Sequence, residues 1–161
     1  MKFLKRIIII AAIALVPTAG AQGFSVWGAA QGGYGGTSNG LHARISVGGG
    51  LSLPIGLGAI GLEITPLGFG SGGRHIYDIA AVLRDVPVPF TPITLRGEIG
   101  LEKSTFGDPF DAIGWALFAG GGVRYEVFGP LGIVGNLRVY LTNPTGTGGI
   151  FAFTVGADVK V

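Results

Sequence analysis

The chain has 161 residues, of which 32 are glycine and none is cysteine, and its formal net charge at pH 7 is +2. Charged residues make up 12% of the chain and hydrophobic residues 48%, whereas soluble domains carry about 25% charged residues. The length fits one domain, the hydrophobic content excludes a disordered glycine-rich tail, and the lack of cysteine excludes disulfides and cysteine-based metal sites.

The first 21 residues have the layout of a secretory signal peptide. Lys2, Lys5 and Arg6 precede the apolar run IIIIAAIALV, and Ala19 and Ala21 supply the small residues of a cleavage site. The run is shorter than the ~20 residues that a membrane-spanning helix needs. We therefore expect residues 1–21 to be removed on export, leaving residues 22–161 as a single domain. Cleavage removes three positive charges, so the mature chain has a net charge of about −1, which gives no indication of a nucleic-acid partner.

From residue 22 onward, turn-forming residues divide the chain into eight segments of strand length. The links PIG, GFGSGG, PVPFTP and GPLG, among others, are rich in glycine and proline, as tight turns require. No segment shows the 3.6-residue period of an amphipathic helix. The sequence thus predicts an all-β protein, an antiparallel meander whose strands cover 24–34, 41–53, 56–67, 74–86, 93–104, 113–128, 131–142 and 149–161.

Strict alternation of apolar and polar residues is clearest in the segment 93–104. In ITLRGEIGLEK, Ile99 belongs to an apolar face and its neighbour Glu98 to a polar one, which is the period of a strand with two different sides. The segments 41–53, 131–142 and 149–161 alternate in the same way. The faces of 24–34 and 74–86 are left unassigned, because apolar and charged residues are mixed there.

The composition of the polar face predicts which side of the sheet points outward. That face consists largely of Gly, Ala and Ser, whereas a soluble surface carries about 25–35% charged residues. An apolar face turned to lipid, with the polar face inside, explains the same pattern. Because a bilayer tolerates no open sheet edge, the eight strands must close into a transmembrane barrel. A barrel of this size has an interior that side chains fill.

The charged residues of the polar face form the expected interior set. Charges held away from bulk water must be paired, and arginine suits bidentate pairing with carboxylates. Six cations and six anions are expected to line the interior as a structural ion network: Arg44, Arg84, Arg96, Arg124, Arg138 and Lys160, with Glu63, Asp78, Glu98, Glu102, Glu126 and Asp158.

The signal peptide, the eight alternating strands, the Arg/Glu interior and the final strand GIFAFTVGADVKV resemble the small OmpA/OmpX-type outer-membrane β-barrels of diderm bacteria. The resemblance extends over the mature chain and is one of pattern. It implies an outer-membrane location, periplasmic termini, and periplasmic turns at PIG, PVPFTP and GPLG, with GGTSNG, GFGSGG, TFGDPFDAIG and NPTGTGG as outer loops. Two departures are the final Val161, where an aromatic residue is usual, and the short outer loops.

Three motifs have a functional interpretation that the sequence does not favour. GLGAIG matches the dinucleotide fingerprint but lacks the helix that must follow it. His42 and His75 lie near Ser46, Ser71 and Asp78 in sequence, as in lipid-modifying barrel enzymes, but without a recognisable nucleophile spacing. Asp108 and Asp111 supply too few oxygens for a calcium site.

These observations favour a non-enzymatic outer-membrane barrel with a structural role in envelope integrity. No cofactor, metal or nucleic acid is expected, and the partners are outer-membrane lipid and other envelope proteins, with the barrel itself a monomer. Two alternatives remain open. A lipid-modifying enzyme would need a His/Ser/acid cluster near one rim, and a soluble exported barrel binding an apolar ligand would need its apolar face inward.

Overall fold

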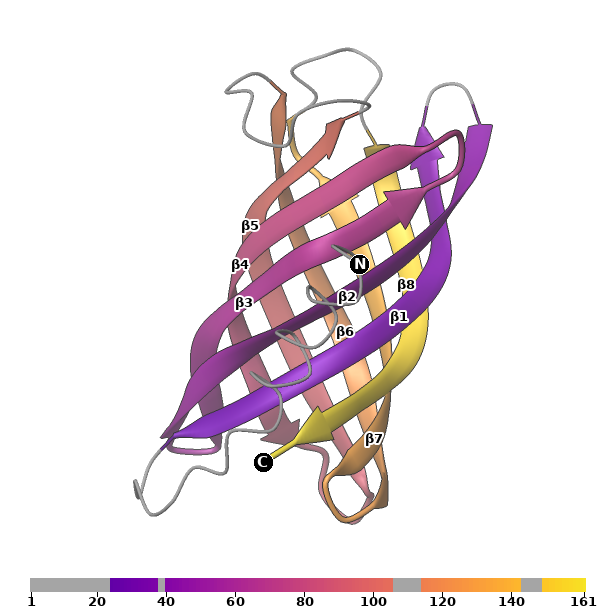
Figure 1. Ribbon diagram of the computed structural model, residues 1–161. Coiled ribbons are helices and arrows are strands. Elements are labelled where there is room, and N and C mark those ends of the chain that lie inside the picture. The colour runs from indigo at the N-terminus through magenta and orange to yellow at the C-terminus, as the bar shows by residue number, and fades with distance from the viewer. Residues whose placement is uncertain (1–23, 38–39, 106–113, 143–148) are drawn as a thin grey trace, which may run out of the picture.

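The computed structural model describes residues 24–37, 40–105, 114–142 and 149–161, which form a closed antiparallel β-barrel (Figure 1). Each strand pairs with the next along the chain, and β8 pairs with β1 to close the sheet. No helix in these ranges has the length and hydropathy to cross a membrane. The strands are β1 (Ser25–Thr37), β2 (Gly40–Ile55), β3 (Gly58–Gly70), β4 (Arg74–Pro87), β5 (Ile93–Thr105), β6 (Trp115–Phe128), β7 (Leu131–Tyr140) and β8 (Gly149–Lys160).

The fold class and the order of eight strands are confirmed, and some turns lie later in the chain than predicted. PIG was expected to connect the second and third strands, but β2 continues through Pro54 to Ile55. The turn consists of Gly56 and Leu57 because Gly56 supplies the left-handed backbone, with φ of 46°, that a tight turn needs. β3 continues to Gly70, so that only residues 71–73 of GFGSGG form the next turn. The expected signal peptide and its cleavage site lie outside the described residues.

The two faces of the sheet are arranged as the alternation predicted. Glu98 is buried, whereas the side chain of Ile99 is 53% exposed. The two unassigned strands follow the same rule. In β1, Trp27 and Ala29 are buried and Ala30 is exposed. In β4 the even-numbered residues from Ile76 to Arg84 are buried, and the odd-numbered Ile79 is exposed. The face could not be assigned from the sequence because β4 sends both apolar and charged side chains inward.

A small apolar cluster lies inside the barrel among these polar residues. It consists of Trp27 and Ala29 from β1, Ala80 and Val82 from β4 and Phe118 from β6. The ring of Tyr140 packs edge-on against Phe118, with 6.2 Å between ring centroids. Apolar side chains from β1, β4 and β6 therefore fill part of the interior, and the charged residues occupy the space that remains.

The register between paired strands shifts at residues that fit poorly in a regular ladder of backbone hydrogen bonds. The register between β3 and β4 shifts between Thr65 and Gly68, on either side of Pro66, which lacks the N–H that a ladder needs. The register between β4 and β5 shifts between Leu83 and Val86, where Asp85 has φ of 59°. Because a bulge interrupts the period of two, residues beyond it no longer follow the simple alternation.

Inward glycines allow neighbouring strands to approach closely where the narrow sheet curves. A Cβ atom at Gly156 of β8 would overlap the carbonyl oxygen of Ala30 on β1, and one at Gly33 would overlap the carbonyl oxygen of Phe153. Both contacts are with backbone, which cannot move aside as a side chain can. Glycine is therefore required at these positions by the curvature of the β8–β1 pair.

We expect Gly156→Ala to destabilise the barrel by about 1–3 kcal/mol, the usual range for overpacking. Gly97→Ala is the matched control, because a Cβ at Gly97 would have no atom within 4 Å, and its effect is expected to stay within about 0.5 kcal/mol. Equilibrium unfolding in urea measures both. Equal stability of the two variants would show that the close approach at Gly156 is unimportant.

Candidate functional site

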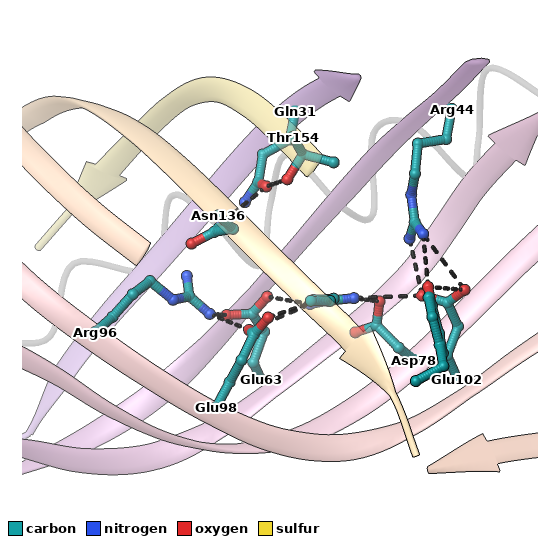
Figure 2. A network of polar contacts seen from close by, with 11 residues as sticks. Gln31, Arg44, Glu63, Asp78, Arg96, Glu98, Glu102, Asn136 and Thr154 are labelled. Carbon is teal, nitrogen blue, oxygen red and sulfur yellow. Dashed lines mark hydrogen bonds and ion pairs between the residues drawn. The ribbon is translucent and has the colours of Figure 1, made fainter. Parts of the chain in front are cut away.

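The most distinctive feature of the interior is a set of buried ion pairs in two groups, of which Figure 2 shows the central one. Strands from all sides of the barrel contribute to them, so that the contacts cross the interior rather than follow one strand. The central network consists of Arg44, Glu63, Asp78, Arg96, Glu98, Glu102, Arg138 and Tyr140. The end network, at the end of the barrel where β8 finishes, consists of Arg84, Asp85, Arg124, Asp158 and Lys160.

Arg138 of β7 is the hub of the central network. Its Nη1 lies 2.7 Å from Oδ2 of Asp78 and 3.4 Å from Oε2 of Glu102. Its Nε donates to Glu98, and its Nη2 lies 3.7 Å from Oε1 of Glu63. Since these carboxylates come from β3, β4 and β5, one guanidinium links the wall at β7 to three strands across the interior.

Two further arginines complete the central network. Arg96 donates from Nη2 to Glu63 at 2.6 Å and to Glu98 at 2.7 Å. Arg44 of β2 donates to Glu102 at 2.9 Å and to the hydroxyl of Tyr140 at 2.8 Å. That hydroxyl in turn donates to Glu102 at 2.6 Å. Hydrogen bonds to charged partners are shorter and stronger than neutral ones, which suits them to hold the interior side chains in one arrangement.

The end network is centred on Asp158 of β8. Arg124 donates to its Oδ1 at 2.8 Å and Arg84 to its Oδ2 at 3.2 Å. The guanidinium of Arg84 also lies 4.2 Å from the ring centroid of Trp27, a cation–π contact. Lys160 donates to Asp85 at 2.9 Å nearer the rim. Ion pairing and a buried aromatic ring thus occupy the interior at this end.

The structure places ten of the twelve predicted network residues inside the barrel as buried pairs, balanced in sign: Arg44, Arg84, Arg96, Arg124 and Arg138, with Glu63, Asp78, Glu98, Glu102 and Asp158. The other two lie at the rim. The side chain of Lys160 is 33% exposed, and that of Glu126 is 57% exposed and 4.0 Å from Arg124. Glu126 adjoins a register shift at the end of β6, so the alternation no longer sets its direction.

Asp85 belongs to the end network, although the sequence pattern did not indicate it. By alternation it would share the outward face of Leu83, but it lies within the β4–β5 bulge and pairs with both Arg84 and Lys160. Aspartate is one of the residues that tolerate a positive φ. An aspartate directly after Arg84, where alternation expects an apolar outward residue, and just before Val86 and Pro87, was the available sign of that bulge.

A neutral amide cluster accompanies the ion pairs on the side of β1, β7 and β8. Oε1 of Gln31 accepts from Nδ2 of Asn136 at 2.9 Å and from the hydroxyl of Thr154 at 2.6 Å. A small cavity adjoins this cluster and is lined by Gln31, Thr154, Arg44 and Ser46, among others. The Nε of Arg44 and the Oδ1 of Asn136 have no protein partner, so this side of the interior is polar and less tightly filled.

His42 lies between two hydroxyl groups near the opposite rim. Its Nε2 is 3.1 Å from Oγ1 of Thr37, and its Nδ1 is 3.4 Å from Oγ of Ser71. The structure thus brings Ser71 to His42, as a nucleophile and base would require, but supplies a hydroxyl where a triad has a carboxylate. Ser46 lines the interior cavity and Asp78 belongs to the central network. His75 packs between the rings of Phe69 and Tyr77.

The remaining motifs offer no cofactor or metal site in the described ranges. GLGAIG forms the β2–β3 turn and the start of β3, with no helix after it, and so lacks the context of a dinucleotide fingerprint. No group of three His, Asp or Glu side chains within the ranges given above is placed to hold a metal ion. Asp108 and Asp111 lie outside those ranges.

Comparison with known proteins relates the chain to other barrels by fold. No protein-family profile matches its sequence, and no curated protein matches it. Among solved structures, Neisserial surface protein A is similar with a TM-score of 0.63 at 18% identity, over 88% of this chain and 98% of that one. A de novo designed transmembrane β-barrel has a TM-score of 0.53 at 14% identity, over 86% and 95% of the two chains. The designed barrel TMB2.3 has a TM-score of 0.50 at 15% identity, over 86% and 94%.

The central network predicts a large penalty for removing its hub. Arg138→Met leaves four carboxylates without their shared cation, and losing one partner of a buried pair costs about 3–5 kcal/mol. Lys160→Met is the control, because this half-exposed pair is expected to contribute no more than about 1 kcal/mol. Urea unfolding of both variants in the same lipid or detergent tests the difference. Similar losses of unfolding free energy in the two variants would mean that the burial of an ion pair does not determine how much it contributes to stability.

Proposed function

We propose that this protein is an outer-membrane β-barrel of a diderm bacterium whose role is structural, with an interior closed by arginine–carboxylate pairs. The observation that carries the proposal is the placement of charge. Among the Asp, Glu, Lys and Arg residues that the structure describes, only Glu126 is exposed. A soluble protein has the opposite arrangement, because ionised groups are strongly favoured in water.

The outer wall supports the same proposal. Large apolar side chains are exposed on every strand, including Ile45 on β2, Ile64 on β3 and Leu137 on β7. A soluble monomer rarely exposes a continuous apolar surface of this extent, whereas lipid requires one. Aromatic residues in the outer parts of the strands are exposed as well, as interfacial belts are: Tyr34, Phe69, Trp115, Tyr125 and Phe151.

The alternative of a soluble barrel with an apolar ligand cavity is wrong, because its apolar face would have to point inward. The described interior is dominated by paired charges and small residues, and the small cavity beside Gln31 is polar. The enzymatic alternative has the Ser71–His42 contact in its favour, but the third partner is the hydroxyl of Thr37 rather than an acid. We therefore retain the structural role.

The closed sheet also limits how the barrel could bind a second chain. Because β1 pairs with β8, none of the eight described strands is left as an open edge of the sheet for a second chain to pair with. The barrel needs no oligomer to satisfy its hydrogen bonds, which supports a monomer surrounded by lipid. Contacts with other envelope proteins would have to use side chains on the wall or the connecting segments.

The membrane assignment predicts the environment of single thiols, since the native chain has no cysteine. In reconstituted vesicles, Ile99→Cys on the outer wall should react with a lipid-soluble thiol reagent and resist a charged aqueous one. Ala80→Cys, a small change at a residue 1% exposed on the inner face, should resist both reagents. Rapid reaction of Ile99→Cys with the aqueous reagent would contradict the proposal.

The closed interior predicts poor ion conduction in planar bilayers. The intact protein should give no large, steady single-channel steps, because ion pairs span the interior from β7 to β3, β4 and β5 and an eight-stranded barrel has little other space. The double variant Glu63→Ala and Arg96→Ala removes one balanced pair and should conduct measurably more. Large steps from the unaltered monomer would show that the ion pairs do not close the interior.

A further inference from the structure

The end of the barrel that carries the chain terminus marked C in Figure 1 presents an exposed apolar residue at each of its connections. Leu57 in the β2–β3 turn is 81% exposed, Phe90 between β4 and β5 is 107% exposed, and Phe128 beside the β6–β7 turn is 81% exposed. Phe24, directly before β1, is 55% exposed. We call these four residues the end ring, because they are distributed around the whole circumference of the sheet.

Phe90 shows that one member of the end ring is held in place at an energetic cost. Its φ of 65° lies in the left-handed region, which bulky residues rarely adopt. The conformation is fixed by the surrounding turn, in which the amide and hydroxyl of Thr91 both donate to the carbonyl of Val88, at 3.2 and 3.0 Å. The amide of Val88 donates to Ile93 at 3.0 Å. A strained, hydrogen-bonded turn thus presents a fully exposed aromatic ring.

The connections that carry the end ring contain no charged residue, and the charged residues at this rim, Glu126 and Lys160, lie on the ends of β6 and β8 instead. The segments 55–58, 87–93 and 128–131 contain no acidic, basic or histidine residue. At the opposite end, the described turn at 71–73 has the sequence SGG and is followed by Arg74 and His75. Turns that face water normally consist of polar residues. The described turns at the end-ring end therefore fit an apolar medium, whereas the described turn at the opposite end fits water.

We infer that the end ring is inserted into lipid at the headgroup–acyl boundary of the membrane leaflet on this side, and so fixes the depth of the barrel in the bilayer. The inference rests on the proposed membrane function. A planar lipid surface meets all four positions at once, whereas a globular partner would contact one part of the circumference. The ring is also continuous with the apolar wall, since Ile55, Ile60 and Leu131 beside the turns are exposed as well.

The inference is tested with single thiols carrying an environment-sensitive fluorophore, in phosphatidylcholine vesicles. Leu57→Cys, Phe90→Cys and Phe128→Cys report on three turns, so failure of one variant to fold leaves two others. Ile99→Cys is the control for the outer wall and Ser71→Cys for the opposite turn. We expect at least fivefold stronger quenching of the three ring positions by lipid carrying a headgroup-level spin label than by aqueous iodide, and the reverse ratio at position 71.

The controls separate failure of this inference from failure of the membrane proposal. Quenching of the three ring positions by iodide, with position 99 still quenched by lipid, would overturn the inference alone. Quenching of position 99 by iodide would overturn the membrane barrel itself. Shielding of the ring that disappears when protein is diluted into excess lipid would show contact between copies of this chain, and would also overturn insertion into lipid.

Discussion

The narrowness of an eight-stranded barrel is the constraint on which the rest of this structure depends. Only enough space for side chains remains inside, so each inward residue must either be small or have a partner across the interior. Gly33 and Gly156 meet the first condition, since a Cβ at either would overlap the backbone of the paired strand. Arg138 meets the second by reaching carboxylates on three other strands. Apolar side chains on the opposite face are then left to the outside, which is the arrangement that lipid requires.

The same constraint links residues that are distant in sequence. Arg44 and Glu102 come from β2 and β5, and Arg84 and Asp158 from β4 and β8. Buried pairs of this kind contribute little net stability compared with well-packed apolar side chains, but they are costly to form incorrectly. In a wall held together by backbone hydrogen bonds, they specify which inward side chains face one another. The network is thus better understood as a determinant of internal order than as the main source of stability.

The fold and most of the inward-facing residues could be predicted from the sequence, because in a strictly alternating strand each residue gives independent evidence of which face points inward. β5 alternates along its whole length, and its inward Glu98 and outward Ile99 were predictable from that pattern alone. β4 was not assignable, since its inner face combines Ile76 and Val82 with Asp78. Asp85 was missed and Glu126 was misplaced because each adjoins a register shift, and a shift of register depends on pairing between strands, which a single sequence does not display.

The division of the interior into two networks has an electrostatic consequence for the whole molecule. The central network holds four carboxylates and three guanidinium groups, and the end network holds two carboxylates with two guanidinium groups and an ammonium group. Each sign is therefore in excess by one at a different depth, although the two groups together are neutral. Glu126, at the same rim as the end network, and the buried Lys103, beside Glu102, oppose this separation of charge. Replacing a single charged group of either network would therefore alter the balance of charge along the barrel axis, and with it the energy of the barrel in a transmembrane field.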